Sequence, residues 1–432
     1  MVSILLTPSS YRTQNMNTAN EVSAPLGSNT VFPPRRVGLL AFAAVVLFMI
    51  YQITVENLFA PLQSEMATEL GLGNARSAVV SASCLLAFAV MQLPAGLLVD
   101  RFGVARLLPA IAALAGLSAF MFARSDGFVT AILARSLLGA AAAFVTPALA
   151  SVVRGVAPAN RFALLMGIGD MAIGIGGVLG VAGGNALENA VGWRTTLVIA
   201  SIVAIPIAIT LLVWIPRRWF SAPPTPIGEV HTSPLAAIKE VISQRTVRIA
   251  ALVFAVSCGT VCGFGGMWNM KLAEGWAWNE QEATIITASF YVGLAVFSPV
   301  AGWLGMRFGS RRTLMVSMWA ALPLFLFWLL VPGTWPLWID IINVMALGAA
   351  LSANVLAFEI ATRGLPTNRV GTAIAVVSLG GVFAGVILEI IPGLVAENVE
   401  AAPLSKVQMA NAIFAFSIAL AIGATYLLPK RA

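Results

Sequence analysis

Two short stretches, GLLVDRFGVAR at residues 96–106 and GWLGMRFGSRR at residues 302–312, decide the fold of this chain. Six residues recur between them at a constant offset of 206 positions: Gly96, Leu98, Arg101, Phe102, Gly103 and Arg106 match Gly302, Leu304, Arg307, Phe308, Gly309 and Arg312. Self-similarity at a fixed offset is typical of an internally repeated architecture. Because glycine permits tight chain reversal and close helix approach, we expect each stretch to form a turn between two helices.

Apolar stretches flank both turns and fill most of the chain. A helix of about 20 apolar residues crosses a bilayer, and twelve stretches reach or approach that length. Ten carry no charge apart from Asp340: 37–55, 77–99, 107–123, 195–216, 249–270, 283–306, 313–331, 336–358, 370–388 and 407–429. The other two, 127–153 and 162–187, contain one charge each. Backbone groups in lipid must bond internally, so we predict an all-α polytopic membrane protein with twelve transmembrane helices in two pseudo-symmetric six-helix bundles.

Polar segments divide the chain into predicted domains. A stretch containing Ser, Thr, Asn and Pro opens the sequence, and a second polar stretch contains several prolines and the lone histidine. We predict a disordered cytoplasmic tail at 1–36, an N-terminal six-helix bundle at 37–216, a cytoplasmic linker at 217–248 and a C-terminal six-helix bundle at 249–429. Paired halves in membrane proteins are typical of transporters with a binding site between them.

Composition and charge exclude several classes of protein. The chain has 432 residues, of which 59% are hydrophobic and 10% charged, against about 45–50% and about 25% in a soluble domain. If the tail and the linker lie on the same side of the membrane, nineteen of the 25 basic residues lie on that side. The excess of basic residues in cytoplasmic loops then predicts that both termini are cytoplasmic and that the protein resides in a cell inner membrane. The net charge of +7 then reflects topology, so we expect no nucleic-acid partner. Three cysteines and one histidine are too few for a Cys/His metal site. We expect no cofactor and no enzymatic activity.

With the repeated turn in place, the sequence resembles the major facilitator superfamily of membrane transporters. The first turn matches the family motif G-x-L-x-D-R-x-G-x-x-R at Gly96, Leu98, Asp100, Arg101, Gly103 and Arg106. The second copy has Met306 in place of the acid, and Arg135 with Gly139 matches the family's R-x-x-x-G helix motif. The resemblance covers residues 37–429 and implies transport by alternating access.

Three further stretches refine this resemblance. Gly192-Trp193-Arg194 before the sixth span is also common in the superfamily. Residues 265–275 and 371–381 resemble a branch that includes bacterial phagosomal amino-acid transporters and lysosomal dipeptide transporters. Exporters of the superfamily often carry a Gly-Pro-rich motif in the fifth span, whereas residues 167–184 are rich in glycine and contain no proline. This departure weakens an antiporter hypothesis and leaves it open.

Three charges within the predicted spans are candidates for substrate binding or proton coupling, because an ionisable group in lipid is costly. Arg135 lies eight residues into its span, about 12 Å deep at about 1.5 Å per residue. It needs an anionic partner, either the solute or a carboxylate such as Glu56; the alternative is a structural pair joining spans one and four. Asp170 lies among glycines in span five and is the candidate for carrying a coupling proton; the alternative is an acid bonded to backbone. For Glu56 the alternative is an interfacial acid at a helix end.

Uncharged side chains add to this candidate site. Tyr51 and Gln52 share a helical face with Glu56 by i, i+4 spacing, which suits a water-filled cavity. Three further candidates are Trp268, Asn269 and Tyr291. They are expected either to line the cavity or to belong to an interfacial belt, which aromatic residues at helix ends more often form. Glu389, at the end of span eleven, is interpreted as interfacial.

A cytoplasmic gate is predicted around the repeated turn. The resemblance implies that Asp100 faces the start of span eleven near Arg369, where the positive end of the helix dipole attracts it. Glu359 lies within expected reach of Arg307 or Arg312. Breaking these contacts would let the two halves rock about a central site. The predicted gate comprises Gly96, Asp100, Arg101, Gly103, Arg106, Arg307, Gly309, Arg312, Glu359 and Arg369.

The sequence thus favours a secondary active transporter that moves a small polar or carboxylate-bearing solute across the inner membrane by alternating access. We expect proton-coupled uptake by a monomer in the lipid bilayer, with sodium as the alternative coupling ion. One alternative function is proton-driven efflux of a hydrophobic compound. Another is a transporter-like receptor or assembly partner that moves no solute, since one fold hosts many functions.

Overall fold

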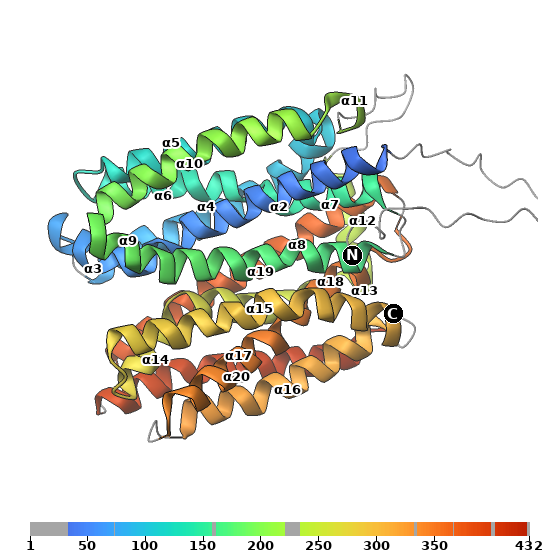
Figure 1. Cartoon of the computed structure of the whole chain (residues 1–432). Helices are drawn as coiled ribbons and strands as arrows, with labels where there is room; N and C mark the ends of the chain where they lie inside the picture. The colour runs from blue at the N-terminus through green and yellow to red at the C-terminus, as the bar shows by residue number, and fades with distance from the viewer. Residues whose placement is uncertain are drawn as a thin grey trace, which may run out of the picture.

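The computed structural model describes residues 33–72, 74–157, 161–220, 234–331, 335–365, 367–398 and 402–429. In these ranges all regular structure is helical, and twelve helical stretches are long and apolar enough to cross a membrane. The all-α, twelve-span prediction is therefore confirmed. Figure 1 shows the helices running roughly alongside one another. The chain enters α2 and leaves α20 at one end of the molecule, the terminal end; α3, α9 and α14 lie at the other, the distal end.

The first half of the chain supplies six spans, three of which are built from consecutive helical segments. Its elements are α2 (Arg35–Asn57), α3 (Phe59–Glu69), α4 (Asn74–Phe102), α5 (Val104–Ala123), α6 (Phe128–Ala142), α7 (Val145–Val156), α8 (Phe162–Val178), the π-helix η2 (Leu179–Gly183), α9 (Gly184–Val191) and α10 (Trp193–Trp214). Two short helices follow before the second half, namely α11 (Arg217–Phe220) and α12 (Pro234–Ser243).

The second half supplies the other six spans. Its elements are α13 (Arg245–Gly263), the π-helix η3 (Phe264–Trp268), α14 (Asn269–Gly275), α15 (Glu280–Phe308), α16 (Ser310–Leu330), α17 (Leu337–Leu351), the 3₁₀ helix η4 (Ser352–Val355), α18 (Leu356–Thr362), α19 (Thr367–Asn398) and α20 (Pro403–Leu427).

Helix boundaries differ from the predicted ones at the polar segments. Helix α2 begins at Arg35, two residues inside the predicted tail, and residues 1–32 lie outside the described residues. Part of the predicted linker is the helix α12, and α13 begins at Arg245 rather than at 249. Helices extend beyond the apolar stretch because their ends reach polar surroundings, where arginine side chains remain solvated.

Both repeated turns adopt the backbone that their glycines were expected to provide. Gly103 lies between α4 and α5 with a φ of 77°, and Gly309 lies between α15 and α16 with a φ of 89°. Only glycine adopts this left-handed region at little cost. One residue is enough to reverse the chain, so each turn joins two long helices directly.

The first helix of each half is interrupted at an equivalent position. Helix α2 breaks at Leu58, and α13 passes into the π-helix η3 at Phe264. These two positions differ by 206 residues, the same offset that relates the two turns. Irregular helical segments in membrane proteins are tolerated mainly where they border a cavity or a neighbouring helix. The repeat therefore extends to the backbone irregularities at the distal end.

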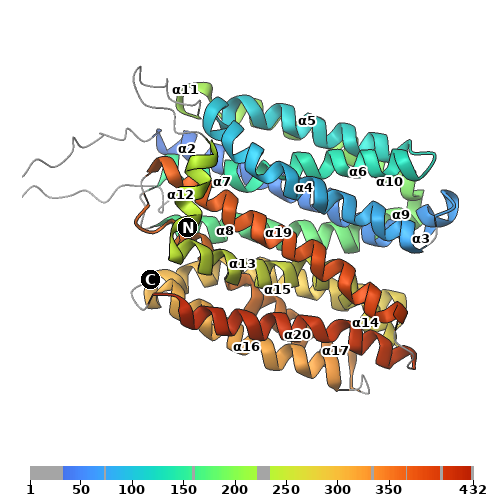
Figure 2. The same ribbon diagram turned by 180° about the vertical axis from the view of Figure 1, so that it is seen from behind.

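Two pairs of long helices join the halves. Helix α8 packs along α15, and α4 packs along α19 (Figures 1 and 2). Glycines make the α8–α15 contact close: a methyl group at Gly174 would lie 2.6 Å from the Cα atom of Ala295, and one at Gly167 would lie 2.6 Å from the carbonyl oxygen of Ser298. The interface between the halves is thus built by direct backbone approach, as small residues allow in membranes.

Candidate functional site

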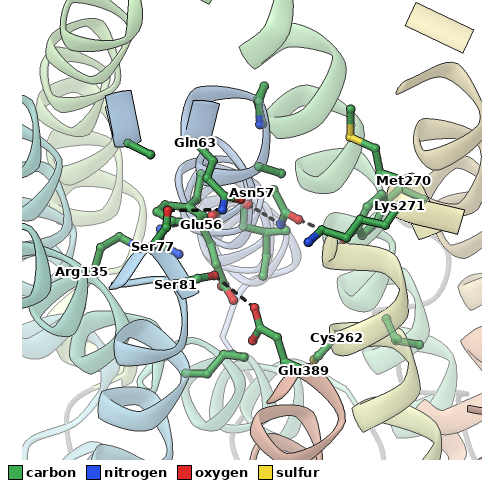
Figure 3. Close-up of a pocket in the computed structure, with 18 of the residues that line it drawn as sticks. Glu56, Asn57, Gln63, Ser77, Ser81, Arg135, Cys262, Met270, Lys271 and Glu389 are labelled. Atoms are coloured by element: carbon green, nitrogen blue, oxygen red, sulfur yellow. Dashed lines mark hydrogen bonds between the residues drawn. The ribbon is translucent and has the colours of Figure 1, made fainter. Parts of the chain in front are cut away.

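A cavity of about 680 Å³ lies between the two halves towards the distal end. Its walls come from α2, α3, α4, α6 and α8 of the first half and from α13, α14, α15 and α19 of the second (Figure 3). This volume is in the range of small-molecule binding sites, about 300–1,000 Å³. Its charged lining residues are Glu56, Arg135, Lys271, Glu274 and Glu389. The cavity can therefore accommodate a small polar molecule in contact with charges of both signs.

Arg135 of α6 presents a guanidinium group to this cavity. The side chain is 4% exposed, and its Nη1 donates to the backbone carbonyl of Glu56 at 3.3 Å. The group also lies over the ring of Phe59, with 4.7 Å between Cζ and the ring centroid. Its Nε is buried without a hydrogen-bond partner, and among the described residues no carboxylate oxygen lies within 4.0 Å. Because burying a cation without an anion costs free energy, the binding of an anionic group by Arg135 stays a prediction.

Glu56 lines the cavity at the end of α2, just before the break at Leu58. The first span runs through α3 to Gln63, so Glu56 lies before the end of its span. Of the two anionic partners considered for Arg135, the Glu56 carboxylate forms no ion pair with it in the structure, since the guanidinium contacts the backbone oxygen of Glu56 instead. Arg135 does link spans one and four, through a peptide group.

Glu389 of α19 is a cavity residue that the sequence interpretation missed. Its Oε1 accepts a hydrogen bond from Ser81 of α4 at 3.1 Å, while its Oε2 is buried without a partner. The interfacial interpretation is wrong because α19 continues past Pro392 to Asn398, which places Glu389 inside the span. The apolar residues after Pro392 in the sequence indicated this continuation, since proline within a membrane helix is tolerated.

Tyr291 of α15 lines the cavity, as one of its two hypotheses predicted. Its ring packs on the bare backbone of Gly177, and its hydroxyl donates to Oδ1 of Asn57 at 3.0 Å. The donor belongs to the second half and the acceptor to the first. This hydrogen bond therefore joins the halves beside the cavity.

Four of the predicted site residues do not line the cavity and instead bond to other helices. The hydroxyl of Tyr51 donates to the carbonyl of Ala200 on α10, and Nε2 of Gln52 donates to the carbonyl of Leu138 on α6. Helix α2 is packed on several sides, so the i, i+4 face that includes Glu56 is divided among several neighbours. The other two residues, Trp268 and Asn269, are buried within the second half.

The hydrogen bonds of Trp268 and Asn269 explain their position. The indole of Trp268 donates to the backbone carbonyl of Glu389 at 3.0 Å. The amide of Asn269 accepts from the indole of Trp328 and donates to the hydroxyl of Thr287. The expectation that these two side chains line the cavity is therefore wrong. They hold the irregular segment around η3 against α15, α16 and α19.

Asp170 lies on α8, partly exposed, and is not among the residues that line the cavity. It precedes by one helical turn Gly174, which contacts the backbone of Tyr291. Asp170 thus lies closer to the terminal end than the cavity does. The structure does not bring it together with Arg135 and Glu56, and its role in proton coupling stays a prediction.

The predicted gate lies at the terminal end. Gly96 of α4 faces α19, where a methyl group would approach Cβ of Ala375 to 3.3 Å. Arg101 and Arg307 each stack on the following phenylalanine at equivalent positions of the two repeats. Arg106 and Arg312 are exposed. The side chain of Asp100 lies outside the described residues, so its predicted contact near Arg369 stays a prediction.

Ion pairs near the gate differ from the expected ones. Glu359 pairs with Arg363 at 3.2 Å, one helical turn along the chain, and not with Arg307 or Arg312. Arg369 pairs with Glu240 of α12 at 2.8 Å, which attaches this linker helix to the start of α19. Helix α12 was not predicted, so this contact could not be foreseen.

A polar network closes the distal end of the first half. Glu69, beyond the distal end of its span, accepts hydrogen bonds from the indole of Trp193 and from Nε of Arg194. Arg194 also donates to the carbonyl of Ala123. The hydrogen bond from Trp193, with that from Arg194, lowers the pKa of the Glu69 carboxyl below its usual value. The Gly-Trp-Arg sequence at 192–194 therefore joins α3, α5 and α10.

Comparison with known proteins adds to this geometry. The sequence profile of the Major Facilitator Superfamily matches residues 40–270 and, again, residues 251–432. An uncharacterized MFS-type transporter of Mycobacterium tuberculosis is 33% identical over 131 residues, which cover 29% of this chain and 22% of that protein. An uncharacterized MFS-type transporter of Methanocaldococcus jannaschii is 30% identical over 133 residues, covering 31% and 34%. The matched segments thus span between about a fifth and a third of these relatives.

Proposed function

Because the chain belongs to the Major Facilitator Superfamily, we propose that it is a secondary active transporter of a small polar, carboxylate-bearing solute. Transport proceeds by alternating access across the inner membrane. The observation that carries this proposal is Arg135, a buried guanidinium at the cavity that contacts a carbonyl and two aromatic rings. A carboxylate would form charge-assisted hydrogen bonds with such a group, frequently bidentate.

The direction of transport follows from the topology proposed from the charge distribution. With both termini cytoplasmic, the terminal end faces inwards and the cavity lies towards the outer face. The α4–α19 and α8–α15 contacts then extend towards the inner side. This arrangement supports an outward-facing conformation that receives solute from outside, and hence uptake.

Coupling of transport to a proton is supported by two carboxylates at different depths between the distal and the terminal end. Glu56 lines the cavity, while Asp170 lies nearer the terminal end on α8. A proton bound in the outward-facing cavity could be released when the halves rock and the inner side opens. Three further charged residues line the same cavity as Glu56, namely Arg135 on α6, Glu389 on α19 and Lys271 on α14.

The charged lining also bears on the alternative functions. Efflux of a hydrophobic compound requires a broad apolar cavity, whereas five charged residues line this one. The resemblance to a branch with amino-acid and dipeptide transporters is compatible with a carboxylate-bearing solute. A receptor without transport activity needs no buried cation at the cavity, and it is distinguished by measuring flux.

The test is uptake by proteoliposomes that contain the purified protein, with the outside more acidic than the inside. Labelled amino acids, dipeptides and organic acids are supplied in turn. We expect gradient-driven uptake of at least one carboxylate, abolished by an uncoupler and reduced at least tenfold by Arg135→Ala. Arg124→Ala, at an exposed arginine of the distal end, is the matched control and should transport normally. Absence of flux for all these solutes with either gradient polarity would contradict the proposal.

A further inference from the structure

Two residues that line the cavity, one in each half, each hold a buried polar atom without a hydrogen-bond partner. On the first half, Nε of Arg135 is a donor without an acceptor. On the second half, Oε2 of Glu389 is an acceptor without a donor. Burying such an atom unpaired costs free energy, so a ligand that forms a hydrogen bond with each of the two atoms binds more favourably than a ligand that pairs with one. The ligand needs an acceptor at one end and a donor at the other.

We propose that the solute is zwitterionic: its carboxylate binds Arg135 and its ammonium group binds Glu389. This inference rests on the proposed function and adds the second charged group. Glu389 lies on α19 and Arg135 on α6, so the solute contacts both halves. Solute binding at the interface between halves is what alternating access requires.

The surroundings of Glu389 suit an ammonium group. Ser81 donates to Oε1 and fixes the orientation of the carboxylate, which leaves Oε2 as the acceptor (Figure 3). An ammonium group carries three donors and no acceptor, so Oε2 can accept one of them. Further acceptors line the cavity, among them the side chain of Asn57 and the carboxylate of Glu56.

Charge balance distinguishes a zwitterion from a simple anion. The cavity is lined by three carboxylates, those of Glu56, Glu274 and Glu389, and by two cations, Arg135 and Lys271. A monocarboxylate would add a further negative charge to a lining in which acids already outnumber bases. A zwitterion adds no net charge and gives both Arg135 and Glu389 an opposite charge. Since a buried charge without a partner is strongly unfavourable, the wall favours the zwitterion.

The test measures binding to the purified full chain in nanodiscs by isothermal titration calorimetry. The probes are the twenty proteinogenic L-amino acids, and for each the acid that lacks the amino group and the amine that lacks the carboxyl group. We expect at least one amino acid to bind at least tenfold more tightly than its des-amino acid and its des-carboxy amine. The variant Glu389→Gln should weaken binding of this amino acid at least tenfold and change that of its des-amino acid less than twofold.

Controls separate a binding defect from a folding defect. Glu65→Gln alters an exposed glutamate of α3 and should bind like the unmodified chain. Ser81→Ala keeps the charge of Glu389 and removes its hydrogen bond, so amino-acid binding should weaken a few-fold even if Glu389→Gln fails to fold.

The possible results separate the two proposals. The zwitterion proposal is overturned, while the proposed function stands, if des-amino acids bind as tightly as amino acids. The same holds if Glu389→Gln weakens both ligand classes equally, or if neither Glu389→Gln nor Ser81→Ala affects amino-acid binding. Binding of none of these probes would overturn the zwitterion proposal, and the uptake test with dipeptides and organic acids then decides the proposed function separately.

Discussion

Replacing Gly174 by alanine tests the close contact between the halves. Gly174 lies on α8 where this helix crosses α15, and an added methyl carbon would be 2.6 Å from Cα of Ala295. It would be closer still to the backbone nitrogen of Ala295 and the carbonyl oxygen of Tyr291. These are backbone atoms, so no change of rotamer can relieve the overlap.

The size of the effect follows from this distance. Ordinary van der Waals contact begins near 3.4 Å, so the contact with Cα of Ala295 at 2.6 Å alone requires the two helices to separate locally by about 0.8 Å, and the closer backbone atoms require more. Overpacking of a close-packed interior costs about 1–3 kcal/mol. At about 2–4 °C per kcal/mol for a unit of about 150–250 residues, we expect Gly174→Ala to lower the apparent melting temperature by roughly 2–12 °C.

The assay is thermal unfolding of the purified protein in detergent, followed by the fluorescence of its eleven tryptophans. Heating rates are kept equal because membrane proteins often unfold irreversibly. The matched control is Gly183→Ala, in the same span, where a methyl group meets no atom within 4 Å. It should melt within a degree or so of the unmodified chain. Equal melting temperatures for Gly174→Ala and Gly183→Ala would refute the close α8–α15 contact.

Two further changes probe the distal end. Tyr291→Phe removes the hydrogen bond to Asn57, and losing about 1 kcal/mol should shift the conformational equilibrium about fivefold away from the outward-facing state. Double electron–electron resonance between spin labels on the two halves measures this shift, and an unchanged distance distribution would contradict it. Glu69→Gln removes the acceptor for Trp193 and Arg194. Because the folded-state pKa of Glu69 lies below its usual value, its ionised form contributes stability above the unfolded-state pKa and loses it as pH falls through the folded-state pKa. The variant should therefore melt lower than the unmodified chain at pH 7, with the difference vanishing in acid; a difference that does not change with pH would exclude this linkage.

Several features of the fold were predictable because they depend on local sequence. The turns at Gly103 and Gly309 require a backbone that only glycine adopts readily, so the motif itself specifies them. The spans follow from length and hydrophobicity, since lipid leaves helices as the available structure. Helix ends were less predictable: α19 runs through Pro392 to Asn398, whereas the apolar stretch was taken to end at residue 388.

The candidate site was predictable only in part. Arg135 stands out because it is a charge deep in an apolar stretch, and the structure places it at the cavity. Glu389 was missed because the predicted span ended at residue 388, one position before it. Gln52 was assigned to the cavity because it shares a helical face with Glu56, yet it donates to α6. Periodicity gives a face of a helix, and packing decides what that face meets.

The number of spans, the repeat and the tight turns could be predicted from residues close together in the chain, because each depends on short-range chemistry or on the hydrophobic length that a bilayer requires. Which charges share a cavity depends on how the helices pack in the folded molecule. Arg135 and Glu389 are separated by more than half of the chain and meet there because α4 packs along α19 and α8 along α15. Those contacts depend on shape complementarity between distant helices, which no local pattern in the sequence specifies.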